Sequence, residues 1–186
     1  MVTITSLWLA ILLAAVAVFV VSAIVHMVMT YHKNDFAALP DEDAALEALR
    51  KLSIPPGQYH APHCASSAAM KDPAFIAKME RGPLAMLSFR AGGKMSMAPM
   101  LTQWFIYTLV VGVFAAYLCS RTLAVGASYP QVFRLAGFAA FLAYAGGQPI
   151  ESIWFWRQWS VCARNIFDGL LYGLLTGGVF GWLWPR

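Results

Sequence analysis

Four long stretches of apolar residues alternate with polar segments along the chain. Each is close to or above the roughly 20 residues that an α-helix needs to cross the hydrocarbon core of a bilayer. The third has Arg134 near its start, where a long basic side chain can reach the polar boundary. The stretches are Ile4–Tyr31, Met95–Ser120, Gln131–Gly147 and Asn165–Pro185. The pattern predicts an all-α membrane protein with four transmembrane helices.

The predicted helices divide the chain into three parts. Residues 1–31 form the first transmembrane helix, residues 32–98 form a polar cap segment, and residues 99–186 contain the other three transmembrane helices. Within the last part, residues 151–163 hold three tryptophans beside basic side chains, which is typical of a membrane interface. This Trp-rich segment is predicted to be a helix in the membrane surface or the start of the last transmembrane helix.

The cap segment contains signals for both helices and a strand. Asp41 precedes apolar residues at helical spacing, and Asp72-Pro73 pairs an N-cap residue with a proline at the first helical position. Gly82-Pro83 predicts the end of that second helix. Leu84–Phe89 predicts a strand, and Gln58–Ser67 an extended or loop segment. We therefore expect a small α+β cap between the first two transmembrane helices.

Composition supports a membrane location and excludes several other classes. The chain has 186 residues, of which 60% are hydrophobic and 12% charged, against about 25% charged in an average soluble domain. The net charge of +4 does not indicate nucleic-acid binding, because the bases form no run and no nucleic-acid motif is present. The first apolar stretch is too long for a cleaved signal and has no basic residues before it. Three dispersed cysteines do not form a disulfide framework.

The distribution of basic residues predicts the orientation. Four crossings place both termini and the 120–133 loop on one side, with three Lys and Arg residues, and the cap segment on the other, with ten. The side richer in bases is usually cytoplasmic. We therefore expect the cap in the cytoplasm and both termini outside it, in a membrane such as the bacterial inner membrane.

Several motifs support a resemblance to a known group. They are Ile54-Pro55-Pro56-Gly57-Gln58-Tyr59, Gly82-Pro83-Leu84, Gln103-Trp104-Phe105, and the stretch from Asp168-Gly169-Leu170 to Trp184-Pro185-Arg186. With these motifs, which extend over most of its length, the chain resembles a group of uncharacterised bacterial four-span membrane proteins. The resemblance implies membrane location and fold, and it carries no established activity.

The last apolar stretch carries four glycines at strict four-residue spacing. They are Gly169, Gly173, Gly177 and Gly181. Glycine is a poor helix former, but a stripe without side chains allows the backbone of another membrane helix to approach closely. We expect this stripe to be a helix-packing face, either against another helix of the same chain or against a partner.

Two features are candidates for metal binding. His60, His63 and Cys64 offer adjacent metal-ligand atoms, with Met95, Met97 and Met100 further along. No second Cys/His pair completes a four-ligand site, so no metal site is predicted. His26 lies near the end of the first apolar stretch, and no other such stretch holds a histidine for a haem. A hydrogen-bonded structural histidine is therefore expected, and no cofactor.

Asp168 is an acid within the last transmembrane stretch. Such residues are functional candidates in general, but Arg164 lies four residues before it, at a spacing that allows the two side chains to pair. Few other polar groups occur in the middle of the four stretches, which disfavours a transport path.

No catalytic motif is present, so no enzyme is predicted. The expected role is that of a non-catalytic structural, assembly or accessory component, whose partners are the lipid bilayer and other membrane proteins or a second copy. The alternative is a small transporter or metal-handling protein that uses Asp168 or the cluster of His60, His63 and Cys64.

Overall fold

The chain folds into two compact units, which we describe separately. The structure is a computed structural model that describes residues 2–186. One unit comprises the chain up to Phe36 together with Ser96–Arg186, and the other comprises Ala37–Met95. The first unit is a bundle of helices, and the second contains two short helices and a two-stranded sheet.

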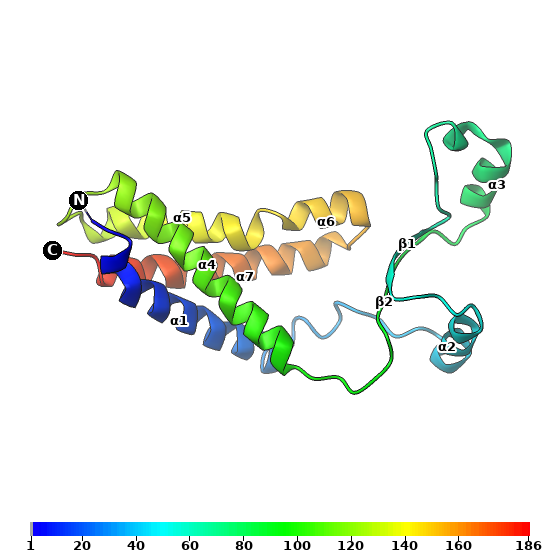
Figure 1. Ribbon diagram of the computed structural model, residues 1–186, viewed down its shortest axis with the longest axis horizontal. Coiled ribbons are helices and arrows are strands. Elements are labelled where there is room, and N and C mark those ends of the chain that lie inside the picture. The colour runs from blue at the N-terminus through cyan, green and yellow to red at the C-terminus, as the bar shows by residue number, and fades with distance from the viewer. Residues whose placement is uncertain (1) are drawn as a thin grey trace. The chain divides into compact units, whose positions relative to one another are not determined.

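Four long helices lie side by side in the first unit (Figure 1). The contact between α5 and α7 is the most extensive, α1 packs against both α4 and α7, and α4 packs against α5. The short helix α6 follows α5 directly and packs against α7. The bounds are α1 Trp8–Met27, α4 Ala98–Thr122, α5 Tyr129–Ala145, α6 Gln148–Phe155 and α7 Trp159–Trp182.

The chain ends and the loop between α4 and α5 lie at the same end of this bundle (Figure 1). The backbone N–H of Gly126 donates to the carbonyl of Pro185 over 2.9 Å, and Trp184 Nε1 donates to the carbonyl of Ala124 over 3.0 Å. Val2 and Trp184 belong to the same buried cluster. These contacts fix the chain ends to the α4–α5 loop.

The predicted glycine stripe of α7 faces α5 along most of its length. A Cβ atom placed on Gly173 would lie 2.8 Å from the carbonyl oxygen of Gly137, and one on Gly177 would lie 2.6 Å from that of Phe133. On Gly169 it would meet the Cβ of Ala145 at 2.8 Å, and on Gly181 the ring of Tyr129 at 2.7 Å. The two helix backbones therefore approach so closely that no side chain fits between them.

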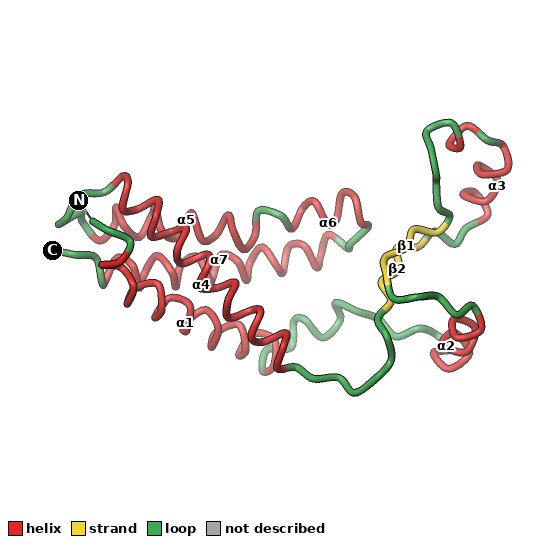
Figure 2. Tube along the Cα trace, in the orientation of Figure 1, coloured by secondary structure: helices red, strands yellow, loops and turns green. Residues whose placement is uncertain are grey.

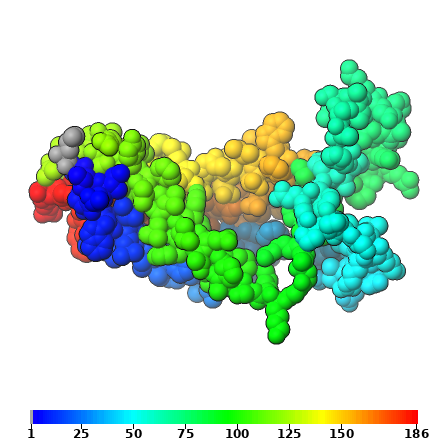
Figure 3. Space-filling model, viewed as in Figure 1, coloured from blue at the N-terminus to red at the C-terminus, as the bar shows by residue number. Residues whose placement is uncertain are grey.

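Two helices among the described residues are long and apolar enough to cross a membrane, Thr5–Met27 and Ala98–Thr122. By length and composition, two of the four predicted transmembrane helices are thus candidates for crossing a membrane, and four crossings are not confirmed. α5 has 17 residues, and α7 carries Arg164 and Asp168. Large apolar side chains are nevertheless exposed on all four helices. In Figure 3, α1 (blue) and α4 (green) lie side by side on the face shown.

The Trp-rich segment is not a single helix. α6 ends at Phe155, Trp156 adopts a left-handed conformation with φ of 59°, and α7 begins at Trp159. The third predicted stretch, Gln131–Gly147, agrees with α5 to within two residues at each end, and α6 follows it as a separate short helix. α7 begins six residues before the predicted start at Asn165.

The second unit contains the predicted α+β elements (Figure 2). β1 (Gly57–Ala61) pairs antiparallel with β2 (Ala85–Phe89), with Tyr59 opposite Leu87. The 3-10 turn Ala69–Lys71 and α3 (Pro73–Arg81) lie between the strands in the sequence, and α2 (Glu42–Lys51) precedes them.

Both predicted helix starts in this unit are confirmed. Asp41 accepts a hydrogen bond from the backbone N–H of Ala44 over 3.0 Å, and Asp72 accepts one from Ala74 over 2.9 Å. None of residues 37–95, all of which the structure describes, is buried.

Candidate functional site

A polar connector after α1 carries three side chains that form contacts at α7. The helix ends at Met27, and residues 28–36 turn through two hydrogen-bonded bends, from Lys33 N–H to Thr30 and from Asp35 N–H to His32, each 3.1 Å long. These bends bring Tyr31, His32 and Asp35 to the part of α7 that holds Asp168 and Arg164. We call residues 28–36 the connector.

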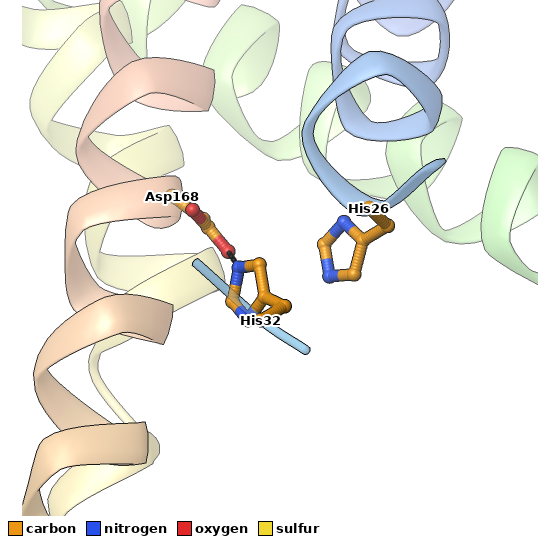
Figure 4. Close-up of side chains that lie close together, drawn as sticks. All are labelled: His26, His32 and Asp168. Atoms are coloured by element: carbon orange, nitrogen blue, oxygen red, sulfur yellow. Dashed lines mark hydrogen bonds and ion pairs between the residues drawn. The ribbon is translucent and has the colours of Figure 1, made fainter. Parts of the chain in front are cut away.

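Asp168 is the buried centre of these contacts, with only 4% of its surface exposed. Its Oδ1 accepts a hydrogen bond from the hydroxyl of Tyr31, and its Oδ2 lies 2.8 Å from Nε2 of His32 (Figure 4). An ionised carboxylate buried in an apolar bundle is costly unless it is hydrogen-bonded. The connector supplies these bonds.

His32 lies between two carboxylates. Its Nδ1 is 2.6 Å from Oδ2 of Asp35, while Oδ1 of Asp35 accepts from Nε and Nη2 of Arg164 over 2.8 and 2.6 Å. Each ring nitrogen of His32 therefore lies within hydrogen-bond distance of a carboxylate oxygen. The Arg164 guanidinium adds a positive charge beside Asp35.

The pairing of Arg164 with Asp168 that the helical spacing allows does not form. Although the two residues are one helical turn apart, Arg164 binds Asp35 of the connector, and both oxygens of Asp168 bind Tyr31 and His32. Local helical spacing allows the pairing but does not decide it, because a partner distant in the sequence competes for the same guanidinium.

Burial and charge fix the protonation of two connector side chains. Burial, the hydrogen bond to Asp168 and the negative charges of Asp168 and Asp35 raise the pKa of Tyr31 well above its usual value. For Asp35, burial acts to raise the pKa, but hydrogen bonds from His32 and Arg164 outweigh it and lower the pKa below the usual 3.8. Near neutral pH, Tyr31 is therefore a hydrogen-bond donor and Asp35 a carboxylate.

His26 adds a third metal-ligand side chain to the pair of His32 and Asp168. Its Nδ1 lies 3.0 Å from the carbonyl oxygen of Ser22, and its ring stacks on that of His32 at 4.6 Å between centroids, 9° from parallel. The hydrogen bond predicted for His26 is thus present. One ligand atom from each of His26, His32 and Asp168 lies within 4.8 Å of the other two (Figure 4). We call these three residues the His–His–Asp cluster.

An open cavity of about 710 Å³ adjoins the cluster, and both His26 and Asp168 line it. Four aromatic rings, of Trp104, Tyr107, Tyr144 and Tyr172, lie on its wall with neighbouring centroids 5.4–6.1 Å apart. Tyr172 is 4% exposed, and its hydroxyl has no hydrogen-bond partner in the part of the chain that the structure describes. Buried polar groups in proteins are usually hydrogen-bonded, so this hydroxyl is an exception on the wall of the cavity.

The other ligand candidates are not members of this cluster. His60 Nδ1 is 2.8 Å from the carbonyl of Pro62, and the thiol of Cys64 donates to the carbonyl of Ser66 over 3.1 Å. Among the described residues, the His–His–Asp cluster is the one group of three that could hold a metal ion, and it does not include His60, His63 or Cys64. Of the methionines considered, Met97 lines the cavity, Met100 begins α4 and Met95 belongs to the second unit.

Sequence reasoning did not identify His32, Tyr31 and Asp35 as site residues. Tyr31 is the last residue of the first predicted apolar stretch, whereas His32 and Asp35 fall in the polar segment that follows it, outside the stretches that could supply a partner for His26 within the membrane. The available signal was the spacing itself, because His32 and Asp35 follow His26 within nine residues.

Comparison with known proteins adds no assignment: no protein-family model, no curated protein and no solved structure matches the chain.

Proposed function

We propose that the protein is an integral membrane protein in which α1, α4, α5 and α7 each cross the bilayer. The observation that carries this proposal is the apolar outer surface of the bundle, including the two helices that are shorter or more polar. Phe138 of α5 is 60% exposed and Trp182 of α7 is 71% exposed. Large continuous apolar surfaces of this kind are rare on soluble monomers and typical of membrane contact.

Helix lengths support the same depth in the bilayer for His26 of α1 and Asp168 of α7. From Trp8 to His26, α1 rises about 27 Å, and from Asp168 to Trp182, α7 rises about 21 Å, at 1.5 Å per residue. In a hydrocarbon core about 30 Å thick, the His–His–Asp cluster then lies near one boundary of the membrane. The first turns of α7 and the helix α6 extend beyond that boundary.

We further propose that residues 37–95 face the cytoplasm and that both termini lie outside it, in a bacterial inner membrane. Ten of the thirteen Lys and Arg residues support this orientation. The hydrogen bond between Gly126 and Pro185, which joins the α4–α5 loop to the C-terminal end, supports both of these segments on one side.

Cys64 provides a direct test of the orientation. Cys119 and Cys162 are buried, whereas Cys64 is partly exposed, so a membrane-impermeant thiol reagent reports on Cys64. We expect labelling only after the cells are made permeable, and none in the Cys64→Ser variant. Labelling of Cys64 in intact cells would reverse the orientation. Reporter fusions at Lys51 and at the C-terminus should give opposite sides.

For the role, we propose a non-catalytic structural, assembly or accessory component. The second unit supports this role because it buries none of its described residues and exposes Leu39, Leu52 and Met70, which suits contact with a bilayer surface or another membrane protein. Native mass spectrometry of the full chain in mild detergent tests the proposal. We expect a defined complex with a second copy or another membrane protein, and a monomer at all concentrations would contradict it.

A second function, metal handling, is favoured by one observation. His26, His32 and Asp168 bring three metal-ligand atoms within 4.8 Å beside an open cavity.

A further inference from the structure

We propose that His26, His32 and Asp168 bind one divalent transition-metal ion of the Zn²⁺ type, at a site that remains open to the cavity. This inference rests on metal handling, the second of the functions proposed above, and it is independent of the number of membrane crossings. Two imidazoles and one carboxylate are ligands that suit Zn²⁺ and its neighbours. The ligand atoms already lie within 4.8 Å of one another.

In both histidines, a hydrogen bond at Nδ1 leaves Nε2 as the ring nitrogen that can bind a metal. The carbonyl of Ser22 can only accept, so Nδ1 of His26 carries the hydrogen and Nε2 of the neutral ring carries the lone pair. Likewise Nδ1 of His32 donates to Asp35. Histidines that bind metals almost always donate their other ring N–H to a carbonyl or carboxylate in this way. Each histidine thus has its Nδ1 held by an acceptor and its Nε2 left as the metal-ligand atom.

The carboxylate ligand is held in the same manner. Tyr31 donates to Oδ1 of Asp168, which leaves Oδ2 as the oxygen that faces His32 Nε2 at 2.8 Å. Asp35, which orients His32, is itself bound by two nitrogens of Arg164. Each proposed ligand side chain is therefore held by a hydrogen bond to a further residue, as metal ligands in proteins usually are.

Metal binding needs a rearrangement of His26, because its ring is stacked nearly parallel to that of His32 and the lone pairs of two stacked rings do not meet at one ion. With Zn–N and Zn–O bonds of about 2.0–2.2 Å, the ligand atoms of a tetrahedral site lie roughly 3.3–3.5 Å apart, so a separation of up to 4.8 Å must shorten by about 1.5 Å. His26 is exposed, and a side-chain rotation can supply the movement. Any proton on Nε2 of His32 is released to water when the ion binds there.

Three protein ligands leave a fourth position for water or another small ligand. Open sites of this kind differ from structural zinc sites, which use four protein ligands. The open position would face the cavity that His26 and Asp168 line, together with the unpartnered hydroxyl of Tyr172.

The test is titration of the full-length protein, purified in detergent and freed of metal with a chelator, with ZnCl₂ in a calorimeter. We expect one zinc ion per chain and a rise in thermal stability on binding. In His26→Gln, affinity should fall at least tenfold and the thermal shift should be lost. His26 is exposed, so this variant should fold, and its metal-free melting temperature checks that it does.

Two further variants complete the test. Asp35→Asn removes the carboxylate that orients His32 and should weaken zinc binding about 10–100-fold, as loss of such partners does in known sites, while the stoichiometry stays at one. The double variant His60→Gln, His63→Gln should bind like the wild type.

Three outcomes would overturn the proposal: no zinc binding, unchanged affinity in His26→Gln, or loss of binding in the His60 and His63 variant. None of these bears on membrane insertion, because Cys64 labelling tests that separately.

Discussion

The two units of this protein differ in what holds them together. In the bundle, side chains from helices far apart in the sequence are fully enclosed, for example Val18 of α1, Ala115 of α4 and Phe180 of α7. In residues 37–95, all of them described, no side chain is buried, and order comes from helix caps and a single strand pairing. Packing between distant segments determines the first unit, whereas local hydrogen bonds determine the second.

This difference predicts how far a perturbation spreads. A bundle with enclosed side chains unfolds as a unit, since any cavity or clash is shared by several helices. A two-stranded sheet with short helices and no core is marginally stable alone, so damage there should stay local. Substitutions in the two units should therefore differ in both size and range.

The largest effect is expected from Gly173→Leu in α7. Even a Cβ atom added at this glycine would lie 2.8 Å from the carbonyl oxygen of Gly137, so a leucine side chain would force α5 and α7 apart. Overpacking typically costs about 1–3 kcal/mol, occasionally more, and we expect the upper part of this range. The melting temperature of the whole bundle in detergent is the measurement.

Gly178→Leu is the matched control for this prediction. The position is on the same helix, but a Cβ there would meet only the hydroxyl of Tyr129, at 3.7 Å. Its melting temperature should stay close to that of the wild type. An equal or larger loss for Gly178→Leu would mean that the glycine stripe is not the packing face.

An intermediate effect is expected from Arg164→Gln, which removes both hydrogen bonds to Asp35. Hydrogen bonds to charged groups contribute roughly 1.5–3 kcal/mol, and because Arg164 is partly exposed we expect about 1.5 kcal/mol. Hydrogen exchange should rise in the connector, residues 28–36, before it rises in α1. The exposed Arg157→Gln is the control, and similar exchange in both variants would contradict the importance of this ion pair.

The smallest effect is expected in the second unit, from Asp72→Ala. Loss of the bond to the backbone N–H of Ala74 should cost α3 about 1 kcal/mol. Faster hydrogen exchange should appear within Pro73–Arg81, with no change in the melting temperature of the bundle. Glu80→Ala, in the same helix but away from the cap, should leave exchange unaltered. A bundle destabilised by Asp72→Ala would show that the two units are coupled and would break the comparison.

The same contrast explains which features the sequence could predict. Caps, helix starts and the glycine spacing are local signals, so Asp41, Asp72 and the strand near Ala85–Phe89 were predicted close to their observed positions. The turn at Trp156 was not predicted, because the surrounding residues have no glycine or proline to mark it.

The candidate site was predicted only in part, since its contacts are not local. Asp168 and His26 were identified as unusual polar residues in apolar stretches. The contact that His32 makes with Asp168, beside His26, was not predicted. His32 and Asp168 are 136 positions apart in the sequence, and no local pattern in either segment indicates that they lie together. Arg164 illustrates the same point, since its real partner lies 129 positions away.

The connector has a mechanical consequence. Phe36, which is 88% exposed, ends the first of the two chain segments in the bundle unit, and Asp35 immediately before it is held by an ion pair with Arg164. A force that pulls on the chain beyond Phe36 therefore acts first on this ion pair and reaches α7 before it can unwind the end of α1. Since α7 packs against α5 without intervening side chains, tension from the polar segment would be borne by that rigid helix pair.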